Sequence, residues 1–210
     1  MEDTMPNLLL RRRRICLTAV FGLAARWPAC ADAPKPFRTR AAIDEVGPDN
    51  IKLTSRSGEK LTVALTSGTG VVAIVPIKLE EIKPGSFIGT AAMPRADGTQ
   101  RALEVHVFPE SMRGTGEGHR PFDLQPQSTM TNGTVGSVTG ATGRTLTVTY
   151  QGGEKTITVP PETPIVTYEP ATRAMLVAGA HVILFGTEGD GGAITATRIT
   201  VGKDGLVPPM

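Results

Sequence analysis

The sequence of 210 residues is poor in several residue types whose absence narrows the possible functions. It contains two cysteines, and aromatic residues make up only 4% of the chain. No apolar run reaches the roughly 18 to 20 residues that a membrane-spanning helix needs, which argues against a permease or helical channel. Glycine and proline are frequent, with 24 and 17 residues. This composition excludes a coiled coil, a collagen and wholesale disorder, and it favours short strands joined by turns.

The first 31 residues are typical of a cleavable export signal. Four arginines, Arg11 to Arg14, precede a mostly apolar stretch from 15 to 25. The small residues Ala29 and Ala31 then stand at the two positions that a signal peptidase recognises. We expect cleavage near Ala31 and a periplasmic or secreted protein. The choice between Sec and Tat export stays open, because the arginine cluster resembles a twin-arginine motif only weakly.

Removal of this segment would change both the cysteine count and the charge. Both cysteines, Cys16 and Cys30, lie within it. The mature chain would therefore have no disulfide, no cysteine-based metal site and no cysteine nucleophile. It would keep 17 basic and 18 acidic residues, a net charge of −1, in place of the +2 of the whole chain. With seven aromatic residues left, this balance argues against nucleic-acid binding, which needs a basic groove and stacking platforms.

The remainder of the chain repeats itself at an offset of about 94 residues. The tripeptide Gly58-Glu59-Lys60 recurs as Gly153-Glu154-Lys155, and Val105 and Val107 match Ile199 and Val201. The repeating copy is about 70 to 75 residues long, which is longer than the unit of a solenoid or a propeller. We therefore interpret it as a duplicated domain.

Within each copy, apolar and polar residues alternate with the period of half-buried strands, as in Ile51-Lys52-Leu53-Thr54. A single helical turn is expected over 79–85, where Pro84-Gly85 stops it. In the first copy the expected strands are 41–47, 50–56, 60–66, 86–92 and 101–108, with a short extended piece at 71–75. The pattern predicts an all-β protein of two tandem five-stranded Greek-key barrels of the OB type. An SH3-like barrel and a sandwich made from both copies are the alternatives.

This organisation gives the following expected boundaries along the chain: signal peptide 1–31, N-terminal linker 32–40, first barrel 41–110, interdomain linker 111–132, second barrel 133–203 and C-terminal tail 204–210.

Five segments form a recognisable set of motifs: Ile82–Gly89, Asp97-Gly98, Val105–Pro109 and, in the linker, Glu117–Asp123 and Ser128–Asn132. Together they resemble a domain-of-unknown-function family of exported bacterial proteins built from tandem small β-barrel repeats. The resemblance covers nearly all of the chain after the signal, and it implies a fold and export but no catalytic residues. Some members are labelled as metal ABC transporter permeases, a label that the absence of a membrane-spanning run argues against here.

No catalytic motif is present. The three histidines are scattered: His106 is expected as a half-exposed strand residue, His181 in the packing position that Phe87 has in the first copy, and His119 in the linker. A serine-hydrolase elbow is absent, and the glycines at 114–118 lack the context of a phosphate loop. We therefore expect a protein without enzymatic activity and without a cofactor.

The interdomain linker is the candidate binding site, because two barrels do not need so long a connection. Its candidate residues are Arg113, His119, Arg120, Phe122 and Asp123, and a weaker set for a metal ion is Glu117, His119 and Asp123. The expected function is an exported binding or scaffolding module that contacts a protein, peptide or glycan of the bacterial envelope. A metal-handling accessory protein and an unrecognised hydrolase are the alternatives.

Overall fold

The computed structural model describes residues 33–140 and 144–209. The expected signal peptide, 1–31, lies outside the described residues. Within the described part, no helix has the length and apolar character needed to cross a membrane.

The all-β class is confirmed, since strands dominate and the helical elements are single 3-10 turns. The strands are β1 (Lys35–Val46), β2 (Asn50–Ser55), β3 (Lys60–Pro76), β4 (Phe87–Pro94), β5 (Gln100–Val107), β6 (Gly118–Pro121), β7 (Thr129–Thr139), β8 (Thr145–Tyr150), β9 (Gly153–Thr158), β10 (Ile165–Pro170), β11 (His181–Glu188) and β12 (Ile194–Gly202). The 3-10 turns are η1 (Leu79–Glu81), η2 (Glu110–Met112), η3 (Arg173–Met175), η4 (Asp190–Gly192) and η5 (Lys203–Gly205).

The period-two pattern produces strands because one face of each is buried. In β2, Ile51 and Leu53 are fully buried while Lys52 between them is exposed. The hairpin from β2 to β3 turns at Gly58, whose φ of 85° is a conformation that residues with a Cβ rarely adopt.

The first barrel is a closed ring of five strands. β1 pairs with β2, and β2 with β3, in antiparallel hairpins. β12 runs parallel to β3, and β11 joins β12 to β1. The order around the ring is that of a five-stranded Greek-key barrel. Its interior is filled by aliphatic side chains that include Ile43, Leu53, Val63, Leu184 and Ile199.

The second barrel closes in the same way. β7, β8 and β9 form consecutive antiparallel pairs. β9 meets β5 in a short parallel pairing, and β4 joins β5 to β7. Ile88, Val105, Leu146, Val148 and Ile157 are fully buried inside this ring.

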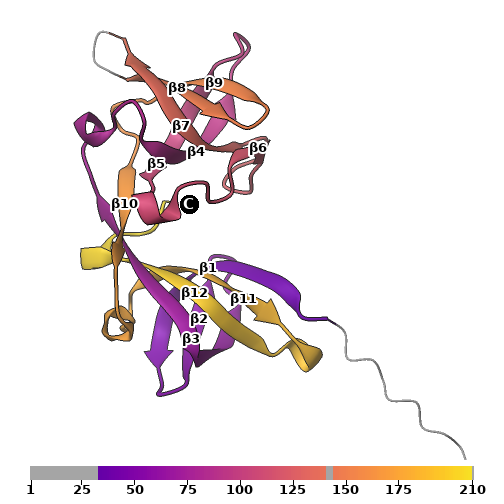
Figure 1. Cartoon of the computed structure of the whole chain (residues 1–210). Helices are drawn as coiled ribbons and strands as arrows, with labels where there is room; N and C mark the ends of the chain where they lie inside the picture. Colours follow the sequence, from indigo (N-terminus) through magenta and orange to yellow (C-terminus); the bar gives the residue numbers. More distant parts are fainter. Residues whose placement is uncertain (1–32, 141–143, 210) are drawn as a thin grey trace, which may run out of the picture. The chain divides into compact units, whose positions relative to one another are not determined.

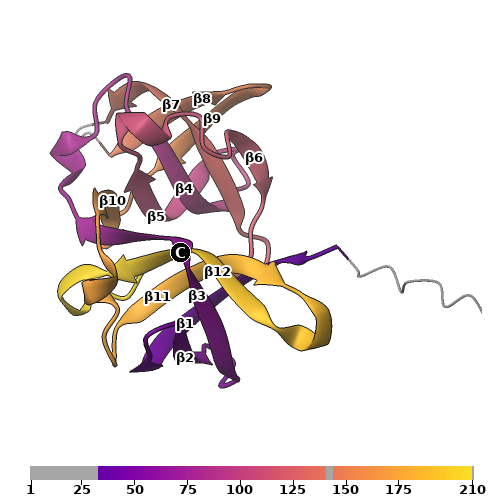
Figure 2. The same cartoon turned by 60° about the horizontal axis from the view of Figure 1, so that its bottom comes forward.

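The tandem arrangement that we expected differs from this pairing, because each barrel contains strands of both copies. The first barrel takes β1–β3 from the first copy and β11–β12 from the second, and the second barrel takes β7–β9 and β4–β5. Figures 1 and 2 show the exchange directly, since the indigo strands β1–β3 lie beside the yellow strand β12. The ranges 41–110 and 133–203 are therefore sequence repeats but do not delimit two separate barrels.

The long strand β3 carries the chain from one barrel to the other. We expected separate pieces at 60–66 and 71–75, but β3 is continuous. Its end pairs antiparallel with β10, and Ile74 stands opposite Tyr168. Because these are equivalent positions of the two copies, the copies cross here in a nearly symmetric manner. After the crossing, η1 leads into β4 of the other barrel.

The expected interdomain linker is ordered and packed on both barrels. It contains η2 and β6, and its last residues already belong to β7. β6 adds to the second barrel by pairing with β7, from Gly118 opposite Asn132 to Pro121 opposite Thr129. Asp123, beyond β6, reaches β1 of the first barrel.

Candidate functional site

A pocket of about 300 Å³ lies between the two barrels and is roofed by the connecting segment from η2 to β6. Its floor comes from β5 and β7 of the second barrel, with His106 and Asn132. Its opposite wall comes from β1, β11 and β12 of the first barrel, with Arg38, Phe185 and Arg198. The pocket therefore exists only because the two barrels and the connecting segment pack together.

The floor of the pocket is one row of residues across three strands. Gly89 in the middle strand, β4, pairs with His106 on one side and with Asn132 on the other. A Cβ at Gly89 would stand under 3 Å from His106 Nε2 and from Asn132 Oδ1. Glycine is therefore required here, because the space above it is filled by these two side chains.

His106 is buried, with 2% of its surface exposed, and not half-exposed as we expected. As expected, His106 lies on the face of β5 opposite Val105 and Val107. Val105 is part of the barrel core, and Val107 packs against that core. The other face of β5 is covered by aromatic rings: Phe108 lies 4.5 Å and Tyr168 lies 5.8 Å from the imidazole, both edge-on. Phe108 directly follows β5, but Tyr168 belongs to the distant strand β10, and local alternation carries no sign of its contact with His106.

Glu104 lies behind His106 and fixes its ring. The carboxyl Oε1 is 3.0 Å from His106 Nδ1, and the Glu104 residue is fully buried. Its second oxygen, Oε2, has no hydrogen-bond partner among the described residues. Burial, together with the negative charge of Glu104, raises the pKa of Tyr168 above its ordinary value, so this phenol stays neutral.

A bulge explains why Glu104 and His106 lie on the face of β5 that points away from the barrel core. The pairing of β4 and β5 shifts between Ala91 and Ala92, which leaves Leu103 as an extra residue. The extra residue reverses the alternation of faces, so Ala102 and Val105 both reach the core while Glu104 is turned outward.

Three guanidinium groups border the pocket. Arg38 is bound to Asp123 at 3.1 Å. Arg198 lies over the ring of Phe185, 4.4 Å from its centroid, and Arg120 donates a hydrogen bond to the carbonyl of Gly116. Among the ion pairs of the described residues, none involves Arg198 or Arg120. These two cations are available to an anionic ligand.

The remaining walls are apolar. They are formed by the side chains of Phe108, Met112, Phe122, Met130 and Phe185. Three of these residues, Phe122, Met130 and Phe185, belong to the apolar cluster that holds the two barrels together. A ligand in this pocket would contact rings and thioethers on several sides, and guanidinium groups from the first barrel and from β6.

The two copies differ at four pairs of equivalent positions, and three of these residues, His106, Phe185 and Arg198, line the pocket. Where the second barrel has Gly89, Ala91, Glu104 and His106, the equivalent positions of the first barrel hold Ile183, Phe185, Arg198 and Thr200. Positions that face the barrel interiors remain aliphatic in both copies. The duplication has therefore kept the fold and given the space between the barrels two chemically different walls.

The structure separates the residues that we predicted for the linker site. Arg120 and Phe122 line the pocket. Asp123 lies beside it and binds Arg38 and Arg40 of β1. The hydrogen bond that Arg40 donates to the Asp123 carboxylate is the main cause that lowers the pKa of Asp123 to about 2.

Arg113 and His119 lie elsewhere. Arg113 pairs with Glu110 and lies 5.9 Å from the ring centroid of Phe87. His119 bonds to Thr131 and stacks on Tyr150. Burial is the main cause that lowers the pKa of this histidine below its ordinary value.

The residues of the weak metal set are engaged separately. Glu117 accepts a hydrogen bond from the backbone of Gln151, His119 bonds to Thr131, and Asp123 binds two arginines. Within residues 33–140 and 144–209, no three His, Cys, Asp or Glu side chains are grouped so that they could hold a metal ion.

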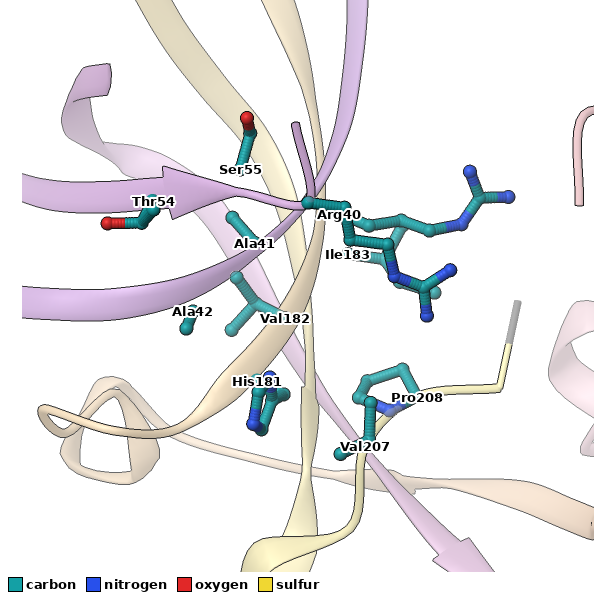
Figure 3. Close-up of a pocket in the computed structure, with 11 residues that line it drawn as sticks. Arg40, Ala41, Ala42, Thr54, Ser55, His181, Val182, Ile183, Val207 and Pro208 are labelled. Atoms are coloured by element: carbon teal, nitrogen blue, oxygen red, sulfur yellow. The ribbon is translucent and has the colours of Figure 1, made fainter. Parts of the chain in front are cut away.

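A second pocket, of about 220 Å³, lies at the other end of β1 and β11 (Figure 3). His181, Val207 and Pro208 border it, together with Arg40. Arg40 is already bound to Asp123, and the other lining side chains are mostly small or aliphatic. This pocket offers a ligand fewer specific contacts than the pocket between the barrels.

Sequence reasoning missed Glu104, Asn132, Arg38, Tyr168 and Arg198 as site residues. The internal repeat contained a usable signal, because Glu104 in one copy is matched by Arg198 in the other, a charge reversal within otherwise similar strands. Which strands face each other could not be obtained from the repeat alone.

No family model, no curated protein and no solved structure matches this chain. The resemblance to a family of exported β-barrel repeats therefore stays a prediction.

Proposed function

We propose that this chain is an exported binding protein without enzymatic activity, and that the pocket between the barrels takes a small ligand with an anionic group and an apolar body. The observation that carries the proposal is the pair Arg198 and Arg120, which border an aromatic pocket without a carboxylate partner in the described residues. Guanidinium groups bind carboxylates and phosphates through charge-assisted hydrogen bonds.

The size of the pocket supports a small ligand over a protein partner. A volume of about 300 Å³ is at the lower end of the range of small-molecule sites, which are mostly apolar with a few polar groups that orient the ligand. A protein partner would need a wider surface. The pocket supports this narrower version of the binding role that the sequence suggests.

The proposal is tested by calorimetric titration of the purified protein with 3-phenylpropionate, which joins an aromatic ring to a carboxylate. We expect saturable binding that Arg198→Leu weakens about tenfold, since a hydrogen bond to a charged group contributes about 1.5–3 kcal/mol. Arg95→Leu is the matched control, because Arg95 is exposed in the turn after β4, away from the pocket. Absence of binding, or equal loss in both variants, would contradict the proposal.

A hydrolase is the second candidate, and the pair Glu104 and His106 favours it. A histidine held by a buried carboxylate has the arrangement of a general base. Release of nitrophenol from p-nitrophenyl acetate, measured with the wild type and with His106→Phe, separates the two functions. A turnover that is lost in the variant would favour the hydrolase, and equal background rates would leave binding as the function.

A further inference from the structure

The pocket also has hydrogen-bond acceptors, and these indicate a second polar group on the ligand besides the anion that the arginines would bind. Asn132 is 4% exposed and lines the pocket. Its Nδ2 donates to the carbonyl of Thr115 at 2.9 Å, which fixes the orientation of the amide. The other end of the amide, Oδ1, is buried and has no donor among the described residues.

His106 presents a second acceptor next to the first. In the tautomer in which Nδ1 donates to the Glu104 carboxyl, Nε2 carries the lone pair and accepts a hydrogen bond from a ligand. Both Nε2 and the Oδ1 of Asn132 lie under 3 Å from the point where a Cβ on Gly89 would stand. The two acceptors therefore flank the same glycine.

The Glu104 carboxyl lies behind these acceptors. Its Oε1 contacts His106 Nδ1, and its Oε2 is buried without a donor in the described part of the chain. An unpaired buried acceptor is unfavourable, and a ligand that supplies a donor to Asn132 Oδ1 recovers that free energy. A positively charged donor would also be attracted by the Glu104 carboxylate.

We propose that the ligand is a zwitterion, an α-amino acid with an apolar side chain or a molecule of the same chemistry. This inference rests on the proposed function and adds a second polar group to its ligand. The ammonium would donate to His106 Nε2 and Asn132 Oδ1, and the carboxylate would bind Arg198 and Arg120. The side chain would lie against the rings of Phe108, Phe122 and Phe185 and against Met112.

Three compounds with the same phenylethyl group test the inference. Phenylalanine carries both charged groups, 3-phenylpropionate lacks the ammonium, and phenethylamine lacks the carboxylate. In calorimetric titrations of the wild-type protein we expect phenylalanine to bind about tenfold more tightly than either analogue, from the charge-assisted bonds that each analogue loses. If 3-phenylpropionate binds as tightly as phenylalanine, the zwitterion is wrong and the anion site stands. If neither binds, both proposals fail.

Variants assign the preference to the acceptors. His106→Phe keeps a ring between Phe108 and Tyr168 but removes Nε2, so we expect phenylalanine to lose about tenfold in affinity while 3-phenylpropionate is unaffected. His119 lies outside the pocket and stacks on Tyr150, so His119→Phe is the control. It should change the affinity for neither compound. If His106→Phe does not fold, Asn132→Leu removes the other acceptor with the same expectation. An unchanged preference in the folded variant would overturn the assignment.

Discussion

Differences between the two copies at single positions give the pocket between the barrels its room and its charge. Gly89 occupies the place that Ile183 has in the other copy, and this difference makes room for the imidazole of His106. Arg198 occupies the place of Glu104 and brings a cation to the facing wall. The chemistry of the site thus depends on few substitutions between two otherwise similar copies.

The first prediction concerns Gly89. Gly89→Ala places a Cβ under 3 Å from His106 Nε2 and Asn132 Oδ1. We expect the free energy of unfolding to fall by about 1–3 kcal/mol, as for other overpacked sites. Gly68→Ala is the control, since the nearest atom to its Cβ would be 3.7 Å away. Chemical denaturation of both variants measures the difference, and equal stabilities would show that the row at Gly89 is not tightly packed.

At the scale of elements, the connecting segment is held on the first barrel mainly by one residue. Asp123 accepts hydrogen bonds from Arg40 at 2.9 and 3.1 Å and from Arg38 at 3.1 Å. Phe122, next to it, lies 5.0 Å below the guanidinium of Arg38. These contacts keep the roof of the pocket in place.

The second prediction is a pH dependence of this anchor. The folded pKa of Asp123 is about 2 against an ordinary value of 3.8. Its stabilisation is therefore complete above pH 3.8 and is lost as the pH falls through about 2. We expect Asp123→Asn to lower the thermal midpoint at pH 6, and we expect its difference from the wild type to shrink below pH 3.8 and to disappear only below about pH 2. Asp190→Asn, an exposed control, should have no pH-dependent effect; a constant difference for Asp123→Asn down to pH 2 would contradict the anchor.

Most elements could be predicted from sequence, and their partners could not. Local alternation and turn glycines are sufficient for strands such as 50–56 and for the turn at 79–81. Pairing depends on contacts more than 100 residues apart, such as Ala41 with Val182, and no local pattern encodes them. Arg120 and Phe122 could be predicted as candidates because they lie in the long linker. Glu104 and Arg198 could not, because their surroundings depend on the pairing of distant strands.

For the whole molecule, the exchange of strands makes the two halves of the sequence inseparable. Each half supplies three strands to one barrel and two to the other, and the pairs β1–β11 and β4–β7 join them. The pocket lies between barrels that are linked by the crossing of β3 and β10. This arrangement holds the two walls of the pocket in a fixed relation.

The third prediction follows from this exchange. A protease site inserted between Pro126 and Gln127, in an exposed turn of the connecting segment, allows the chain to be cut between the copies. We expect the two fragments to elute together in size-exclusion chromatography and to separate only in denaturant. Fragments that separate under native conditions would show that each barrel is built from one copy.

The most direct test of the binding site is a titration of the ¹⁵N-labelled protein with phenylalanine, followed by amide chemical shifts. We predict saturable shifts at His106, Gly116 and Asn132, which line the pocket between the barrels, and at Gly89, which pairs with two of them. Shifts confined to His181 and Val207, at the second pocket, or no shifts at all, would contradict this prediction.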